Sequence, residues 1–141
     1  MSENDKLKKQ LDEFDRQAVA RVKNELKKSV VPVSGINLIA AQPRLGSAQA
    51  VKDLAYQLKG EMADLFLVLG VEIDGKPLLT VMISEELVKS RGLDASRIVR
   101  EAGKEIKGGG GGQPFYATAG GKDVSGLSAA VFKAKSFISE L

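Results

Sequence analysis

The stretch of sequence with the clearest chemical potential begins at Lys107 and ends at Lys122. Between these two lysines stand a run of five glycines and a later pair: Gly108, Gly109, Gly110, Gly111 and Gly112, then Gly120 and Gly121. Because glycine has no side chain, backbone N–H groups can converge there on phosphate oxygens, and a nucleic-acid backbone can approach to contact distance. The alternative is a flexible low-complexity linker. The flanking lysines favour a phosphate-binding loop, although the spacing is not that of the P-loop motif.

Four basic residues precede the glycines at a helical spacing. A helix is predicted from Asp94, its N-cap, to about Lys107, and at 100° per residue its basic side chains fall within a sector of about 80°. They are Arg97, Arg100, Lys104 and Lys107. A solvated helix face would show the same pattern. Because this stripe leads into the glycine run, we expect both to bind the same polyanion, together with Gln113, Tyr116 and Lys122.

Charge is unevenly distributed along the chain, whose net charge is +3. Residues 61–90 include six acidic and two basic residues, whereas residues 97–135 include seven basic and three acidic ones. The basic part contains the glycine run, and its second glycine pair leads through Lys122 and Asp123 into a predicted helix. The first N–H groups of that helix would also attract an anion. This asymmetry favours a face that contacts phosphate groups.

The sequence contains neither histidine nor cysteine. Their absence excludes Ser-His-Asp and Cys-His catalysis, zinc hydrolase sites and disulfide bonds. Magnesium chemistry on carboxylates would need a convergent acidic cluster, and pairs such as Glu85-Glu86 fit a solvated helix start better. We therefore expect a binding module with no catalytic residue, metal site or cofactor of its own.

Nothing in the sequence indicates a membrane or a secretory route. No apolar run approaches the ~20 residues that span a bilayer. The first five residues are polar and acidic, unlike a signal peptide. We predict a cytoplasmic protein with no membrane partner.

The predicted fold class is α/β, with a mixed β-sheet flanked by helices and preceded by a long N-terminal helix. Helices are expected over residues 4–30, 47–59, 84–92, 94–107 and 124–141, and strands over 35–41, 64–71, 77–83 and 115–119. Asp74-Gly75 predicts a tight hairpin turn between the two middle strands. Pro32 ends the first helix, which divides the chain into a linker helix, 1–32, and a globular domain, 33–141. The linker helix lies against its own domain, or serves as an interdomain strut or dimerisation arm.

The stretch from Lys107 to Lys122 resembles the glycine-rich motif of the DHH-associated domain, in the form found at the C-terminus of alanyl-tRNA synthetases. The matching positions are Gly108 to Gly112, Pro114, Ala117, Ala119, Gly120, Gly121 and Lys122. The resemblance covers residues 35–141, and the first helix resembles the linker that precedes this domain. It implies a part of an alanine-tRNA ligase that is non-catalytic by itself and binds the outer corner of tRNA. Its partners would be tRNA, expected to be alanine-specific, and the remainder of the synthetase, whose aminoacylation and editing it supports. ATP, magnesium and zinc would serve other domains of that enzyme.

Gln113 departs from the pattern of this family, which often has arginine before the proline. Phosphate contact is then expected to shift to Lys107 and Lys122. Related DHH phosphoesterases place a histidine after their glycines, so Gln113 also counts against the alternative of a nucleic-acid-binding domain from such an enzyme. A further alternative is an oligomerisation module that forms a homodimer through the N-terminal helix. Of Phe115 and Tyr116, one is expected in the core while the other stacks on a base, unless both are buried.

Overall fold

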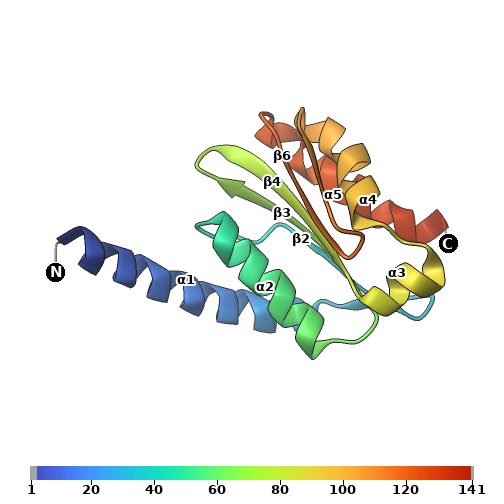
Figure 1. Cartoon of the computed structure of the whole chain (residues 1–141), viewed down its shortest axis with the longest axis horizontal. Coiled ribbons are helices and arrows are strands. Elements are labelled where there is room, and N and C mark those ends of the chain that lie inside the picture. The colour runs from blue at the N-terminus through green and yellow to red at the C-terminus, as the bar shows by residue number, and fades with distance from the viewer. Residues whose placement is uncertain (1–2, 141) are drawn as a thin grey trace.

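The computed structural model describes the backbone of residues 3–140 and the side chains of residues 16–138. Within these residues the chain forms a six-stranded sheet with helices on both faces (Figure 1), so the predicted α/β class is confirmed. The strands are β1 (Val31–Val33), β2 (Ile36–Ala41), β3 (Leu65–Ile73), β4 (Lys76–Ile83), β5 (Gly109–Gly112) and β6 (Tyr116–Gly120). The helices are α1 (Glu3–Lys28), α2 (Ala48–Glu61), α3 (Glu85–Arg91), α4 (Ala95–Ala102) and α5 (Leu127–Lys135).

The strands follow the order β1-β2-β3-β4-β6-β5 across the sheet. β2 and β3 are parallel and are connected through α2, whereas every other neighbouring pair is antiparallel. The β3–β4 hairpin turns at Asp74 and Gly75, whose φ angles of 53° and 77° are those that the predicted tight turn requires. β6 returns beside β4, and β5 follows it at the edge. The glycine run and β1 therefore lie at opposite edges of one sheet.

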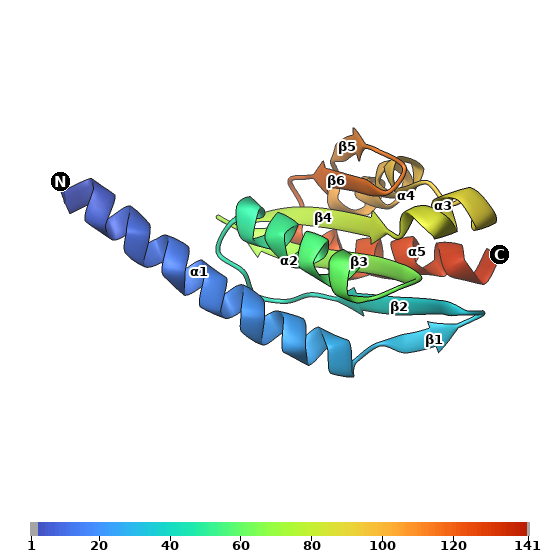
Figure 2. The same ribbon diagram turned by 60° about the horizontal axis from the view of Figure 1, so that its bottom comes forward.

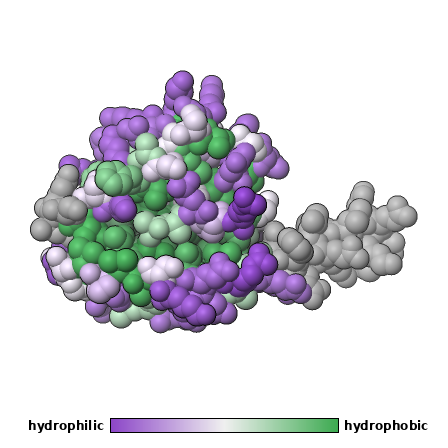
Figure 3. Space-filling view, turned by 180° about the vertical axis from the view of Figure 1, so that it is seen from behind, coloured by the Kyte–Doolittle hydropathy of each residue, from purple (hydrophilic) through white to green (hydrophobic). Residues whose placement is uncertain are grey.

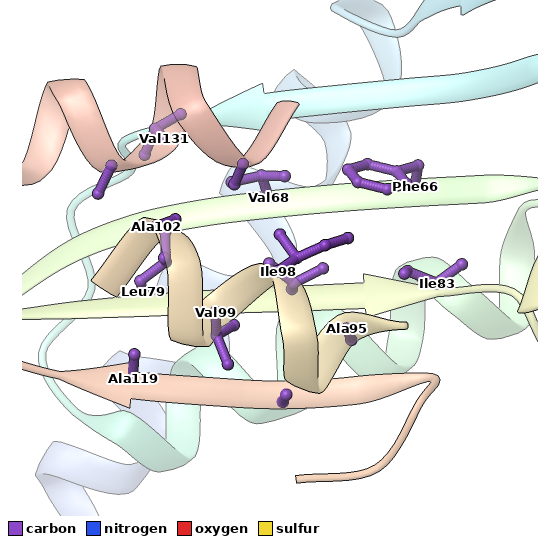
Figure 4. Packing of buried hydrophobic residues seen from close by; sticks show 14 of the residues in the cluster. Phe66, Val68, Leu79, Ile83, Ala95, Ile98, Val99, Ala102, Ala119 and Val131 are labelled. Carbon is purple, nitrogen blue, oxygen red and sulfur yellow. The ribbon is translucent and has the colours of Figure 1, made fainter. Parts of the chain in front are cut away.

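A hydrophobic core covers each face of the sheet, because successive side chains of a strand point to opposite faces. Phe66 and Val68 of β3 belong to the cluster beneath α4 and α5, where Figure 4 shows them beside Ile98. Leu65 and Leu67 of the same strand belong to the cluster beneath α2 and α1. Burial on both sides explains why this strand is an almost continuous apolar run rather than an alternating one.

The second half of α1 packs on its own domain. Its buried residues are Ala18, Val19, Val22 and Leu26. On the same side, Lys23 and Lys27 form ion pairs with Glu61 of α2 at 2.8 and 2.6 Å. The first half extends away from the sheet (Figure 2), and its apolar residues Leu7, Leu11 and Phe14 lie outside the described side chains. The interpretation that this helix lies against its own domain thus holds for residues 16–28. The domain boundary at residue 32 stays a prediction.

Two helix starts follow their sequence signals. The backbone N–H of Ala50 donates to the Ser47 hydroxyl at 3.1 Å, which makes Ser47 the N-cap of α2. The backbone N–H of Ser96 donates to the Asp94 carboxylate at 3.0 Å, which caps α4 in the same way. Both helices therefore begin where a side-chain oxygen satisfies an otherwise unpaired N–H group.

β1 was not expected from the sequence, which indicated only that the first helix ends at Pro32. After α1 the chain forms a three-residue strand that pairs with β2, with Val31 opposite Leu38. The turn at Ser34-Gly35 has φ angles of 52° and 81°. Proline is tolerated here because an edge strand leaves some N–H positions outside the ladder.

Two predicted helices are shorter than expected because glycines interrupt them. The helix over 94–107 ends at Ala102 and continues as a 3-10 helix, Gly103–Ile106. The one over 124–141 is divided into a 3-10 helix (Val124–Gly126), α5 and a 3-10 helix (Ser136–Glu140), with residue 141 outside the described part. A Cβ at Gly126 would overlap the Glu105 carbonyl oxygen, and one at Gly103 would lie 3.2 Å from the Ala119 Cβ. The segments thus approach backbone to backbone, which helical periodicity cannot indicate.

The face opposite that of Figure 1 is apolar at its centre. Figure 3 shows hydrophobic residues gathered there within a hydrophilic rim. Among exposed large hydrophobic residues are Val31 and Phe132, at 52% and 65% of their full exposure. This apolar face is therefore not the cationic surface that a polyanion would need.

In the described part of the chain, no helix is both long and apolar enough to cross a membrane.

Candidate nucleic-acid interface

The glycine run forms an edge strand and not the loop predicted from the sequence. β5 pairs antiparallel with β6, from Gly109 opposite Gly120 to Gly112 opposite Ala117. The two strands are joined by a tight turn, in which the Gln113 N–H donates to the Tyr116 carbonyl at 2.8 Å. Figure 2 shows β5 as the outermost strand on its side of the sheet. The ladder to β6 fixes the run in place, so the linker alternative is wrong.

Alternate glycines of the run are required by close packing. A Cβ at Gly108 would overlap the carbonyl oxygen of Gly120, and one at Gly110 would overlap that of Thr118. Gly112 is similarly placed against the backbone of β6. These positions bring β5 so near its neighbour that only glycine leaves room.

The other glycines are not required by close packing within the fold. Nothing in the described part of the chain lies within 4 Å of a Cβ built at Gly109 or at Gly120, and at Gly111 only the Ser96 hydroxyl does, at 3.8 Å. Glycine weakens a strand because it loses the most conformational freedom on ordering. The fold would accept side chains at these places, yet the sequence has glycine at each of them. The outer edge of β5 is therefore bare, which means that it carries no side chains. A bare edge is what close approach of another backbone requires.

The four predicted basic residues do not form one continuous helical stripe. Arg97 and Arg100 are exposed on α4, and the Arg100 guanidinium donates to the Ser96 carbonyl at 3.3 Å and to the Ser96 hydroxyl at 3.2 Å. Lys104 lies in the 3-10 helix and pairs with Glu101 at 3.4 Å. Lys107 is beyond it, with a left-handed φ of 54°. The stripe is therefore corrected to two arginines on α4, one lysine in the 3-10 helix that follows it, and Lys107 at the residue where that helix ends.

Lys107 and Lys122 are brought together by the backbone. The N–H groups of Lys122 and Asp123 both donate to the carbonyl of Ile106, at 2.9 and 3.0 Å. This places residues 107 and 122 at the same end of the β5–β6 ribbon. Both lysine side chains are exposed, as binding to phosphate requires.

Asp123 occupies the predicted anion site at the start of the last helical segment. Its carboxylate accepts hydrogen bonds from the hydroxyl and the backbone N–H of Ser125, the latter at 3.0 Å. The Ser125 hydroxyl chiefly, and the backbone bonds and the charge of Lys107 to a lesser degree, hold the pKa of Asp123 below its ordinary value. The chain's own carboxylate thus accepts the Ser125 N–H, which counts against the expected bound anion at this helix start.

Phe115 and Tyr116 are both half-buried, so neither of the two simple alternatives describes them. The Lys59 ammonium lies 4.3 Å from the centre of the Phe115 ring. The Tyr116 ring meets Tyr56 of α2 edge to face, with 5.2 Å between ring centres. Burial raises the pKa of Tyr116, which favours its neutral phenol. Gln113 is exposed in the turn between β5 and β6.

Sequence reasoning did not indicate the contribution of α2 to this region. Gln49 and Lys52 of α2 line a pocket of about 200 Å³ together with Tyr116 and Thr118 of β6. The period-two alternation of Tyr116 and Thr118 was a usable signal that the two share a face. Nothing local indicated which helix would lie opposite them. In the part of the chain that the structure describes, no group of three or more acidic residues is arranged to hold a metal ion.

The DHHA1 domain family matches residues 35–140, so the chain belongs to this family. The match includes the glycine run, the strand β6 and the elements that position them. The resemblance inferred from the glycine motif is confirmed at this level.

The chain is also similar to one part of several alanine-tRNA ligases. It is 49% identical to the alanine-tRNA ligase of Cytophaga hutchinsonii over 132 residues, which are 94% of this chain and 15% of that protein. It is 48% identical to the enzyme of Christiangramia forsetii over 136 residues, which are 96% of this chain and 16% of that protein. The chain thus spans less than a fifth of the length of these relatives.

Several solved structures share the fold. The C-Ala domain from Aquifex aeolicus alanyl-tRNA synthetase superimposes with a TM-score of 0.69 at 24% identity, covering 78% of this chain and 97% of that domain. A DHH-domain protein described as a member of the s1p family of ribosomal proteins superimposes with a TM-score of 0.56 at 12% identity, covering 89% of this chain and 31% of that one. At these identities the likeness shows the fold alone.

Proposed function

We propose that this chain is the tRNA-binding C-terminal module of an alanyl-tRNA synthetase, which docks on the corner of tRNA and supports aminoacylation and editing by the rest of the enzyme. The observation that carries the proposal is the bare glycine edge of β5 with cations beside it. The identity of nearly half the residues to one part of alanine-tRNA ligases supports the choice of parent enzyme. ATP, magnesium and zinc are then used by other parts of that enzyme.

The edge and its cations suit recognition by shape. Open positions at Gly109 and Gly111 admit a sugar-phosphate backbone, while Lys107 and Lys122 stand at one end of the ribbon to neutralise phosphates. Contacts of this kind give affinity and orientation without reading base sequence. Structured RNA is recognised largely in this way. Selection of the alanine-specific tRNA would accordingly come from other parts of the synthetase.

Reversal of charge at Lys104 and Lys107 tests this function. In the variant Lys104→Glu/Lys107→Glu we expect tRNA affinity to fall at least about tenfold at moderate salt. The slope of log K against log salt should become shallower by about 2, because each lost phosphate contact removes about one released counterion. The measurement is a titration of labelled tRNA at several salt concentrations.

A matched control changes the same net charge away from β5. Arg21→Glu/Lys28→Glu alters two exposed residues of α1, which packs near the opposite edge of the sheet. Its tRNA affinity and salt slope should stay close to those of the unchanged protein. Equal loss in both double variants would mean that only overall charge matters, and no loss in either would remove β5 as the binding surface.

A further inference from the structure

A small pocket lies on the α2 face of the sheet, where the helix no longer covers the outer strands. Among the strands, α2 packs chiefly on β3 and β4, and β6 lies beyond β4 in the sheet. The pocket of about 200 Å³ is lined by Gln49 and Lys52 from α2, by Thr80 from β4, and by Tyr116 and Thr118 from β6. Its walls thus combine an amide, an ammonium group and three hydroxyls, one of them on an aromatic ring, with the apolar side chains of Ala48 and Leu78.

Thr80 is the unusual member of this pocket. It is fully buried, and its hydroxyl has no hydrogen-bond partner among the described residues. Its strand neighbours Leu79 and Val81 face the α4–α5 core, whereas Leu78 and Met82 pack on the α2 side. Alternation therefore points Thr80 to the α2 face, on which the pocket opens. Buried hydroxyls normally find a partner, so Thr80 leaves one hydrogen bond unmade at the floor of this pocket.

The groups around Thr80 are of a kind that recognises a heteroaromatic ring. Tyr116 is half-buried against Tyr56, and the Lys52 ammonium stands 6.0 Å from the centre of the Tyr56 ring. The Gln49 amide donates to Asp53 at 2.9 Å, which leaves its oxygen and a second N–H available. An inorganic anion would need more than one cation and no aromatic wall. A nucleobase needs an aromatic surface for its face and donors and acceptors for its edge.

The pocket also adjoins the bare glycine edge. Thr118 lines the pocket and is at the same time paired with Gly111 of β5. An RNA strand that lies along β5 would therefore carry its bases past β6 towards Tyr116. Phosphates near Lys107 and Lys122 and a base in the pocket are compatible with one bound strand.

We propose that this pocket receives one unstacked nucleobase of the bound RNA, whose edge hydrogen-bonds to Thr80 and Gln49 while its face packs on Tyr116. The proposal rests on the proposed function, RNA binding. It adds a base-recognition site to a surface that otherwise contacts phosphate. Lys52 lies at the mouth of the pocket, where it meets the phosphate of that nucleotide.

The chain offers an internal reporter for this site. It contains two tyrosines and no tryptophan. Tyr116 lines the pocket, and Tyr56 is in edge-to-face contact with Tyr116. Tyrosine fluorescence therefore reports on Tyr116 in the pocket wall and on Tyr56 beside it. Titration with a tRNA transcript, or with a short single-stranded RNA, should quench it, and a fully paired RNA hairpin stem should not.

Two variants separate base recognition from a purely structural role. Thr80→Val keeps the shape and removes the hydroxyl, so the protein should be at least as stable to urea. Its affinity for tRNA should fall roughly 2- to 10-fold, the factor that one hydrogen bond represents. Gln49→Ala, at an exposed position that cannot unfold the core, should act in the same direction. Neither should change the salt slope, because neither removes a phosphate contact.

The outcomes also distinguish the base pocket from the proposed function, tRNA binding, on which it rests. Binding of tRNA measured by its own label, with no change in tyrosine fluorescence and full affinity in both variants, would overturn the base pocket and leave the proposed function in place. Absence of tRNA binding by the unchanged protein would overturn both. Quenching together with weakened binding in both variants would support a nucleobase in the pocket.

Discussion

Asp123 shows how one carboxylate limits and organises the surface that is proposed to bind phosphate. It accepts hydrogen bonds from Ser125 and lies near Lys107, so it caps the following 3-10 helix and offsets part of the local positive charge. The same contacts lower the pKa of its carboxyl group in the folded protein. A lowered folded pKa means that the charged form is favoured by folding, and stability is linked to pH accordingly.

The linkage gives a prediction for Asp123→Asn. The stabilisation from the charged carboxylate is fully present above the ordinary pKa of about 3.8 and is lost as pH falls through the lower folded value. The variant should therefore be less stable than the unchanged protein at neutral pH, and the difference should shrink below about pH 4. Urea unfolding of both proteins between pH 7 and pH 3 measures this. A difference that is constant across the range would show that the charge of Asp123 does not contribute.

At the scale of the element, β5 is a strand made of residues with little preference for strands. Glycine is depleted in strands, and its ordering costs more entropy than that of any other residue. What holds β5 is pairing with β6 at a separation that side chains would prevent. The strand therefore exists because of its neighbour, and its open positions, Gly109 and Gly111, are the ones that the proposed function assigns to RNA.

Alanine substitutions along β5 distinguish these two kinds of glycine. Gly110→Ala should destabilise the protein by about 1–3 kcal/mol, because its Cβ would overlap the Thr118 carbonyl. Gly109→Ala and Gly111→Ala should change stability by less than about 1 kcal/mol, and a gain is expected where alanine reduces the freedom of the unfolded chain. Those two should nevertheless weaken tRNA binding several-fold, because a methyl group would occupy the open edge. Urea unfolding and tRNA titration on the three variants test the contrast. Full tRNA affinity in Gly109→Ala and Gly111→Ala would show that no backbone approaches there.

At the scale of the whole molecule, the two edges of the sheet differ in the residues that they expose. The β1 edge carries Pro32, which blocks strand addition, and α1 lies on the same side of the molecule. The β5 edge carries bare glycines and exposed cations. The second half of α1 belongs to the α2 core, so removal of the whole helix would delete Val22 and Leu26 and expose the apolar residues of α2 in the same cluster. A loss of stability would then obscure any test of the role of α1.

Deletion of residues 1–15 avoids that difficulty and addresses the homodimer alternative. The shortened chain keeps every described buried residue of α1. Its unfolding and its tRNA affinity should match those of the full chain within about twofold, because β5 lies at the other side of the sheet. Light scattering on both chains completes the measurement. A dimer that becomes a monomer on deletion, with loss of tRNA binding, would favour the oligomerisation module over a self-sufficient RNA-binding surface.

Several features were determined by the sequence alone, because their causes are local. Ser47 and Asp94 cap helices through N–H groups only two or three residues away, and Asp74-Gly75 forms its turn from its own backbone preferences. The apolar runs of β3 and β4 indicated a buried hairpin, and the glycine motif indicated the family. Each of these depends on neighbours within a few residues.

Other features were decided only by tertiary structure, because their causes lie far away in the chain. Five glycines favour a loop over a strand by their intrinsic preference, and it is pairing with β6 that makes β5 a strand. Gly103 and Gly126 end helical turns because other backbone segments press against them. Tyr116 meets Tyr56, sixty residues earlier in the chain, and Thr80 faces a pocket whose other wall is α2. Packing and register decide which side chains meet across the sheet. The local pattern of the sequence does not indicate either of them.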